Sequence, residues 1–159
     1  MEYAFDADEI FEMAEQIERN GIEFYTAAAK QTDDPAAKKL LADLAAMEAD
    51  HRQTFATLRA ELAGAVQVAD FFDPDQNAVR YLRSLADSHI FVKREVDLSS
   101  LQAVLKSAIS AEKDAIAFYV GMKEAMTDAA GKKKIGHIIR EEMGHVVLLG
   151  RRMAALDAA

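Results

Sequence analysis

The sequence predicts an all-α protein, an antiparallel four-helix bundle with a long crossover connection between the second and third helices. Three observations carry this prediction. Of the 159 residues only two are proline and seven are glycine, so little interrupts a helix. Apolar residues recur at alternating spacings of three and four along four stretches, which places them on one face of each helix. Hydrophobic residues make up 51% of the chain, enough for one core, so residues 1–159 are expected to form one domain.

The first two helices are predicted at about 6–30 and 35–62, with clear signals at their ends. Asp6 opens a capping-box pattern, and Asp34 precedes a proline at the first helical position. Gly64 is expected to end the second helix. The inward stripe of the first helix contains Phe11, Ala14, Glu18, Gly21, Tyr25 and Ala28, and that of the second contains Ala37, Leu41, Leu44, Glu48, His51, Phe55, Leu58 and Leu62.

The connection covers about residues 65–96 and is long enough to cross from one end of a bundle to the other. A turn is predicted at 71–75, and the stripe Ala78, Tyr81, Leu82 and Leu85 predicts a short amphipathic helix after it. His89 and Phe91 follow; His89 has no ligand-type neighbour at helical spacing, so we expect a structural or exposed residue.

The third and fourth long helices are predicted at about 99–126 and 129–156. Asp97 or Ser99 is expected to start the third helix, and Asp128 the fourth. The inward stripe of the third helix contains Leu101, Leu105, Ala108, Glu112, Ala115, Tyr119, Met122 and Met126, and that of the fourth contains Ile135, Ile138, Glu142, His145, Leu149 and Met153.

An internal repeat relates the first helix pair to the second. The motif Glu48-x-x-His51 recurs as Glu142-x-x-His145, and 142 minus 48 and 145 minus 51 both equal 94. The same offset relates Glu18 to Glu112, Phe24 to Phe118, Tyr25 to Tyr119 and Asp34 to Asp128. The chain therefore consists of two copies of one unit, each with one Glu in its first helix and Glu-x-x-His in its second.

The polar residues of this repeat interrupt apolar stripes, which predicts a buried site for two metal ions. Residues three apart lie about 60° apart around a helix, so one Glu-x-x-His pair can bind one ion or two adjacent ones. Buried carboxylates cost several kcal/mol each unless they are protonated or bind cations, and two divalent ions would balance four of them. The candidate metal ligands are Glu18, Glu48, His51, Glu112, Glu142 and His145.

The predicted ligand set is rich in carboxylate, with one imidazole for each ion, and this suits iron or manganese better than structural zinc. The two ions are expected about 3.5–4 Å apart. Glu48 and Glu142 are the candidates for bridging them, with His51 and His145 on different ions. The alternative, that both motifs lie on the surface, is disfavoured because two copies stand at one offset within apolar stripes.

Two tyrosines and three further glutamates lie near these ligands in the sequence. Tyr25 and Tyr119 have two interpretations, core packing or hydrogen bonding beside the metals, and they are the candidate catalytic residues. Glu15, Glu23 and Glu141 are expected on the solvated flanks, although Glu141, next to a candidate ligand, can also support the site from outside.

Charge and composition exclude several classes of function. A formal net charge of −8 argues against nucleic acid and anionic membranes as partners. The absence of cysteine excludes disulfides, thiolate metal sites and iron–sulfur clusters from these residues. The acidic N-terminus does not have the pattern of a signal peptide, and no apolar run is long enough to span a bilayer, so a cytoplasmic location is expected.

The ligand pattern resembles the rubrerythrin branch of the ferritin-like superfamily. That superfamily binds two metal ions with one Glu from each of two helices and Glu-x-x-His from each of the other two. The stretches 21–25 (Gly-Ile-Glu-Phe-Tyr) and 81–87 are rubrerythrin-like in particular. The resemblance implies a ferritin-like bundle with a non-haem di-iron centre, held by the six residues named above, in which manganese is an alternative to iron.

The resemblance also implies a di-iron oxidoreductase of peroxidase or oxidase type, which reacts with hydrogen peroxide or dioxygen. Without cysteine the chain needs an external electron donor. Ile109 and Ala115 stand where rubrerythrins carry a further carboxylate, so the ligand set is closer to that of generic ferritin-like oxidases. The alternatives are iron oxidation and storage, and a bundle used only for protein contacts. A homodimer is expected, in which the similar halves can exchange helices.

Overall fold

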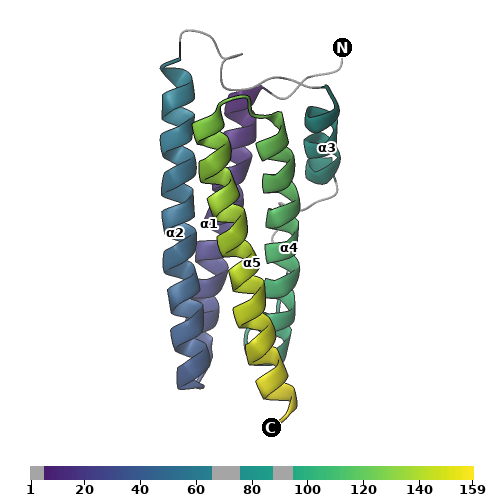
Figure 1. Ribbon diagram of the computed structural model, residues 1–159. Coiled ribbons are helices and arrows are strands. Elements are labelled where there is room, and N and C mark those ends of the chain that lie inside the picture. Colours follow the sequence, from purple (N-terminus) through teal and green to yellow (C-terminus); the bar gives the residue numbers. More distant parts are fainter. Residues whose placement is uncertain (1–5, 66–75, 88–94) are drawn as a thin grey trace.

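The computed structural model describes residues 6–65, 76–87 and 95–159, and over these residues the secondary structure is helical. The helices are α1 (Ala7–Gln31), α2 (Pro35–Ala63), α3 (Gln76–Asp87), α4 (Leu101–Ala125) and α5 (Ala129–Asp157). The four long helices lie side by side, and the short α3 lies against the outside of α4 (Figure 1). The predicted all-α four-helix bundle is confirmed. None of the helices in these three ranges has the length and hydropathy to cross a membrane.

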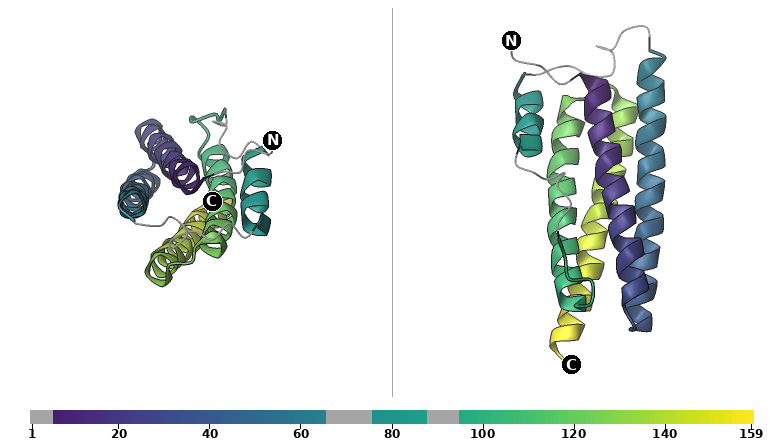
Figure 2. Two further views of the ribbon diagram at one scale, coloured as in Figure 1. Left: turned by 90° about the horizontal axis from the view of Figure 1, so that it is seen from above. Right: turned by 180° about the vertical axis from the view of Figure 1, so that it is seen from behind.

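The bundle consists of two antiparallel helix pairs, α1 with α2 and α4 with α5. The segment that contains α3 connects the end of α2 at one end of the bundle with the start of α4 at the other, so α2 and α4 run in the same direction (Figures 1 and 2). The two repeat units found in the sequence correspond to these two pairs. A crossover of this kind is one of the known ways to connect a four-helix bundle.

Side-chain caps set the starts of the long helices. Asp6 accepts from the backbone N–H of Glu9 at 2.8 Å, and the Glu9 carboxylate accepts from the N–H of Asp6 at 3.0 Å, which completes the predicted capping box. Asp34 and Asp128 cap α2 and α5 as expected, and Gly64 caps the end of α2.

The third long helix begins later than predicted, because neither Asp97 nor Ser99 is its N-cap. Ser100 is its N-cap, and its hydroxyl accepts from the backbone N–H of Ala103 at 3.2 Å. Asp97 instead accepts from the N–H and the hydroxyl of Ser99, at 3.0 and 2.6 Å, in a turn just before the helix. Asp and Ser at neighbouring positions compete for the same capping role, and the sequence does not say which one the turn uses.

The predicted stripes face the core, and the six candidate ligands divide that core in two. Along every long helix they lie between one cluster that includes Phe11, Phe55 and Met122 and another that includes Leu41 and Leu105. Among the stripe residues of the long helices, Leu101 and Met153 are partly exposed because they lie near an end of the bundle, and Gly21 is partly exposed because it lines a cavity. The polar residues are therefore surrounded by apolar packing above and below.

The short α3 is fixed against α4 at a position that requires glycine. Leu82 is fully buried, and the Tyr81 hydroxyl donates to the carbonyl of Ala117 at 2.8 Å. A Cβ on Gly121 would lie 2.5 Å from the Tyr81 ring, so only glycine allows this approach. The predicted short helix is present, whereas the predicted turn at 71–75 and the residues His89 and Phe91 lie outside the described residues.

Candidate metal centre

The four long helices bring all six candidate ligands together near the middle of the bundle. None of the six residues is more than 4% exposed. The contributing residues are Glu18 from α1, Glu48 and His51 from α2, Glu112 from α4, and Glu142 and His145 from α5. Each helix delivers its ligand because the alternating spacing of the stripe carries the polar residue into the same buried seam as its apolar neighbours.

The ligand atoms form two overlapping groups with a composition suited to metal. In each group, one oxygen or nitrogen from every member lies within 4.8 Å of the others. The first group contains Glu18, Glu48, His51 and Glu142, and the second contains Glu48, Glu112, Glu142 and His145. Glu48 and Glu142 belong to both groups, so the cluster has the form of a di-metal site in which two carboxylates are shared.

The two histidines occupy equivalent places in this cluster. The Nδ1 atom of His51 lies 3.1 Å from the Glu142 carboxylate, and the Nδ1 atom of His145 lies 3.1 Å from the Glu48 carboxylate. Each imidazole therefore meets a shared carboxylate from the other half of the repeat. Their rings stack with centroids 5.7 Å apart, and both Nδ1 atoms lie close to the Glu142 carboxylate.

The tyrosines connect the two halves in the same reciprocal way. The Tyr25 hydroxyl donates to Glu112, and the Tyr119 hydroxyl donates to Glu18. Both rings are also packed in the core, Tyr119 with its centroid 4.9 Å from that of Phe55. Burial and the nearby carboxylates raise the pKa of both phenols well above the usual value, so the hydroxyls keep their protons. Packing and hydrogen bonding thus coexist at these positions.

Burial and the charges of neighbouring side chains shift the pKa values of the cluster residues. Burial raises the pKa of Glu18 well above its usual value, and it raises that of Glu112 to about 8 despite the contact with His145. Burial acts on Glu142 as well, but the contacts with both histidines lower its pKa to about 2. Although burial alone would lower the pKa of the imidazoles, the carboxylates around them raise it to about 9 for His51 and about 12 for His145.

Several atoms at the centre lack a hydrogen-bond partner among the described residues. Some of these atoms lie within hydrogen-bonding distance of another polar atom but are poorly aligned for a hydrogen bond. Nδ1 of His145, for example, lies 2.8 Å from the Glu142 carboxylate. The atoms are Glu18 Oε2, Glu48 Oε1, Glu142 Oε2 and both ring nitrogens of His145. Buried polar atoms without partners are costly, and all but the Nε2 atom of His145 point into the cluster, so the donor set fits a pair of cations.

The glutamates expected on solvated flanks behave differently from one another. Glu23 is exposed, as predicted. The prediction for Glu15 is wrong: it is only 7% exposed, and it lies 3.1 Å from the guanidinium of Arg59. That arginine comes from the facing helix, so the sequence of α1 carried no signal for the pair. Glu141 is partly exposed, and its carboxylate lies 2.8 Å from Nε2 of His51, which makes it a support for a candidate ligand.

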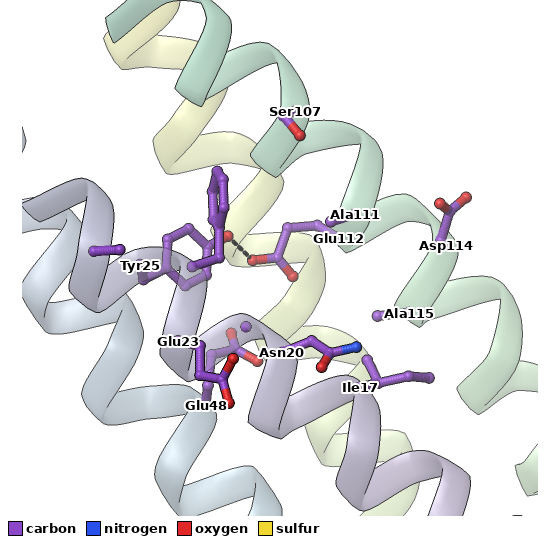
Figure 3. Close-up of a pocket in the computed structure, with 13 residues that line it drawn as sticks. Ile17, Asn20, Glu23, Tyr25, Glu48, Ser107, Ala111, Glu112, Asp114 and Ala115 are labelled. Carbon is purple, nitrogen blue, oxygen red and sulfur yellow. Dashed lines mark hydrogen bonds between the residues drawn. The ribbon is translucent and has the colours of Figure 1, made fainter. Parts of the chain in front are cut away.

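A cavity of about 310 Å³ lies between α1 and α4 beside the cluster. Glu48, Glu112 and Tyr25 line it, and in Figure 3 the Tyr25 hydroxyl points toward the Glu112 carboxylate across the gap between the helices. Small residues such as Gly21 and Ala115 leave this space; a Cβ on Gly21 would lie 3.3 Å from the Glu48 side chain. The sequence did not reveal the cavity, because its walls come from helices about 90 residues apart.

A second cavity, of about 580 Å³, lies between α2 and α5 on the side of His51. Its wall is charged, and Glu141 and His137 line it together with Asp50 and basic residues of α5. The cluster is therefore approached from two sides, by a mainly apolar cavity at Glu112 and by a charged one at His51.

The pKa shifts predict opposite effects of pH on the metal-free and metal-loaded protein. His51 and Glu112 have folded pKa values of about 9 and about 8, above their unfolded values, so the folded chain binds more protons. Their contribution to stability is complete below the unfolded pKa and is lost as pH rises through the folded one. In chelator, the unfolding temperature should therefore fall between about pH 5 and pH 9. Metal displaces these protons, so binding should tighten over the same range.

The measurement is thermal unfolding at several pH values, with chelator and with excess Mn²⁺. The lowered pKa of Glu142 adds an opposite trend only below about pH 4.5, outside this window. Chelated protein that becomes more stable toward pH 9 would contradict the buried, proton-holding cluster.

Comparisons with known proteins agree with this geometry. The family model described as rubrerythrin matches residues 9–153 of the chain. A crystal structure of a ferritin-like diiron-carboxylate protein from Thermotoga maritima superposes with a TM-score of 0.68 at 22% sequence identity, over 97% of this chain and 98% of that one. This likeness shows that the two proteins share a fold. Among curated proteins no relative matches.

Proposed function

Because the chain belongs to the rubrerythrin family, we propose that it is a non-haem di-iron oxidoreductase that reduces hydrogen peroxide or dioxygen with electrons from an external donor. One observation carries the proposal: two overlapping groups of buried ligand atoms share Glu48 and Glu142. Shared carboxylates hold two ions close together, and a close pair of ions can act on one small oxidant.

Each residue of the cluster has a role in this proposal. Glu48 and Glu142, which belong to both ligand groups, would hold both ions. Glu18 and His51 complete the first subsite, and Glu112 and His145 complete the second. Four carboxylates and two neutral imidazoles balance two divalent ions, and a mainly oxygen ligand set with one imidazole for each ion suits iron, with manganese as the alternative.

Reduction of hydrogen peroxide to two waters takes two electrons and two protons, and two ferrous ions becoming ferric would supply both electrons. The side chains of this protein form the environment of that reaction. Tyr25 and Tyr119 keep their protons and, by donating to Glu112 and Glu18, hold the two unshared carboxylates in place. They are our candidates for catalytic residues, because their hydroxyls are protonated donors beside the reacting centre.

The cavity between α1 and α4 suits a small neutral oxidant. Its exposed wall is mainly apolar, with residues such as Phe24, Ala27 and Ala111. Its polar lining residues are Asn20, Glu23, Glu48, Ser107, Glu112 and Asp114. Neither hydrogen peroxide nor dioxygen is charged, so both can enter such a cavity without the cost of desolvating an ion.

Electrons must come from outside these 159 residues in this proposal. The 159 residues contain no cysteine, so they cannot form a rubredoxin-type iron site. A second copy of the chain is the expected partner in a homodimer, and the electron donor is a separate redox protein or small reductant.

The test begins with chelator-treated protein loaded anaerobically with two equivalents of Fe²⁺. Reoxidation is followed by stopped-flow absorbance after mixing with hydrogen peroxide or with dioxygen, and turnover is then measured with an added reductant. We expect peroxide to reoxidise the protein at least tenfold faster than dioxygen, with repeated cycles. Failure to bind iron would end the proposal.

Iron oxidation and storage is the alternative outcome of the same experiment. It would be indicated by comparable rates with dioxygen, by many irons for each chain, and by assembly into a closed shell in light scattering. A dimer that binds two irons and turns over peroxide would exclude storage.

A further inference from the structure

The contacts that cross between the halves correspond on the inner side of the cluster, but the contacts on its outer side differ. Inside, His51 and His145 meet shared carboxylates at the same distance of 3.1 Å, and each tyrosine holds the carboxylate of the other half. On the inner side His145 Nδ1 is the more closely surrounded, at 2.8 Å from Glu142 and 3.4 Å from Glu112, while His51 Nδ1 lies 3.8 Å from Glu18. Outside, Nε2 of His51 lies 2.8 Å from a carboxylate oxygen of Glu141. Nε2 of His145 is buried and has no hydrogen-bond partner in the described part of the chain.

The repeat explains this difference at the level of the sequence. The position equivalent to Glu141 in the first half, 94 residues earlier, is occupied by Met47. Methionine offers no charged acceptor to an imidazole N–H. The difference on the outer side therefore comes from one substitution between the two copies of the unit, next to a ligand motif that is otherwise the same.

An outer partner changes what an imidazole can do as a ligand. When Nδ1 of a histidine faces a metal, the neutral ring carries its proton on Nε2, and a carboxylate there fixes this tautomer, orients the ring and makes the ligand nitrogen more basic. His51 has such a carboxylate in Glu141, whereas for His145 none lies among the residues that the structure describes. The Glu141 carboxylate is in turn 3.4 Å from Nε2 of the exposed His137, in the charged cavity between α2 and α5.

We propose that Glu141 is a positioning residue that makes the two metal subsites unequal, so that the Glu18–His51 subsite binds its ion first and more tightly than the Glu112–His145 subsite. This inference rests on the proposed di-metal site. It assigns the exchangeable ion to the subsite beside the apolar cavity, where Glu112 and Tyr25 lie. The more tightly held ion would belong to the opposite side, where Glu141 contacts His51.

Stepwise binding of Co²⁺ to chelator-treated protein tests the inference. Isothermal calorimetry and the visible absorption of Co²⁺ should resolve two steps in the wild type. Glu141→Gln keeps the size of the side chain and removes its charge. It should weaken the first step ten- to hundredfold, the usual effect of losing an outer partner, and leave the second step within about twofold. The two steps then merge.

A matched control separates the contact from a general loss of charge. Asp50→Asn removes one negative charge from the same cavity. In the described part of the chain, the His51 ring nitrogens contact Glu18, Glu141 and Glu142 and not Asp50. It should leave the two steps separate. Proton NMR of the Co²⁺-loaded protein adds a direct readout: the Nε2–H signal of His51 should shift in Glu141→Gln and stay unchanged in Asp50→Asn.

The outcomes distinguish this inference from the proposed function. A wild type that binds no Co²⁺ contradicts the di-metal site itself. A wild type that binds two ions while Glu141→Gln weakens both steps equally, or neither, overturns only the role of Glu141. Equal changes of the Co²⁺ binding steps in Glu141→Gln and Asp50→Asn would also overturn the role of Glu141, because the loss of negative charge alone would then explain the effect.

Discussion

Glu142→Gln is expected to remove both metal ions rather than one. Glu142 belongs to both ligand groups, and its carboxylate lies near the Nδ1 atoms of His51 and His145, at 3.1 and 2.8 Å. An amide binds hard divalent cations much more weakly than a carboxylate does. The affinity of both steps should therefore fall by more than the ten- to hundredfold that loss of an outer partner costs. Metal analysis after loading and dialysis should approach zero, compared with two equivalents in the wild type.

Two variants complete this test. Glu48→Gln, at the equivalent position of the repeat, should have the same effect, because Glu48 is the other shared carboxylate. Glu124→Gln changes an exposed glutamate on α4 and should leave two equivalents of metal. Retention of one tightly bound ion in Glu142→Gln would mean that the carboxylate is not shared.

His51→Ala is expected to destabilise the metal-free protein more than removal of the whole ionic cluster does. His51 is 3% exposed, and its charged imidazole compensates the carboxylates around it. Removing one partner of a buried ion pair costs about 3–5 kcal/mol, because the other charge stays buried. Replacement of a buried ion pair or triad by well-packed hydrophobic groups of similar volume is often neutral or stabilising by about 1–4 kcal/mol, because no buried charge remains.

The comparison variant changes all six residues, each to a neutral side chain of similar size. Glutamine at positions 18 and 112 keeps an acceptor for the hydroxyls of Tyr119 and Tyr25, so neither hydroxyl loses its partner. The substitutions are Glu18→Gln, Glu48→Gln, Glu112→Gln and Glu142→Gln, with His51→Leu and His145→Leu.

Thermal unfolding of both variants in chelator gives the result, with ferrous oxidation measured alongside. The sextuple variant should remain folded and lose all reaction with peroxide and dioxygen. If the unfolding temperature of His51→Ala is not lower than that of the sextuple variant, the cost of buried charge has been overestimated. If the sextuple variant still oxidises ferrous iron catalytically, the reaction occurs elsewhere in the protein.

Local rules predicted the helices because the signals are local. The capping box at Asp6, the Asp34-Pro35 start and the caps at Gly64 and Asp128 depend on residues within one turn, and the structure has them all. The start of α4 was missed because Asp97, Ser99 and Ser100 can all cap a helix, and the turn before α4 uses Asp97.

The internal repeat made the cluster predictable as well. Equal offsets placed Glu18 with Glu112 and the two Glu-x-x-His motifs with each other, and a bundle that buries four stripes must bring their polar members together. The burial of Glu15 was missed for the opposite reason. Its partner Arg59 lies 44 residues away on α2, and no pattern within either helix relates the two.

By itself, the sequence determined the helices, their inward faces and the six buried polar residues, because periodicity and repeat offset are properties of the chain. Only the tertiary structure decided which atoms meet. Tyr25 donates to Glu112 and Tyr119 to Glu18, and Glu141 contacts His51, while Nε2 of His145 has no such partner among the described residues. Such contacts depend on how far and at what angle two helices pack. Those quantities arise from the volumes of all the side chains between the helices, and no single motif encodes them.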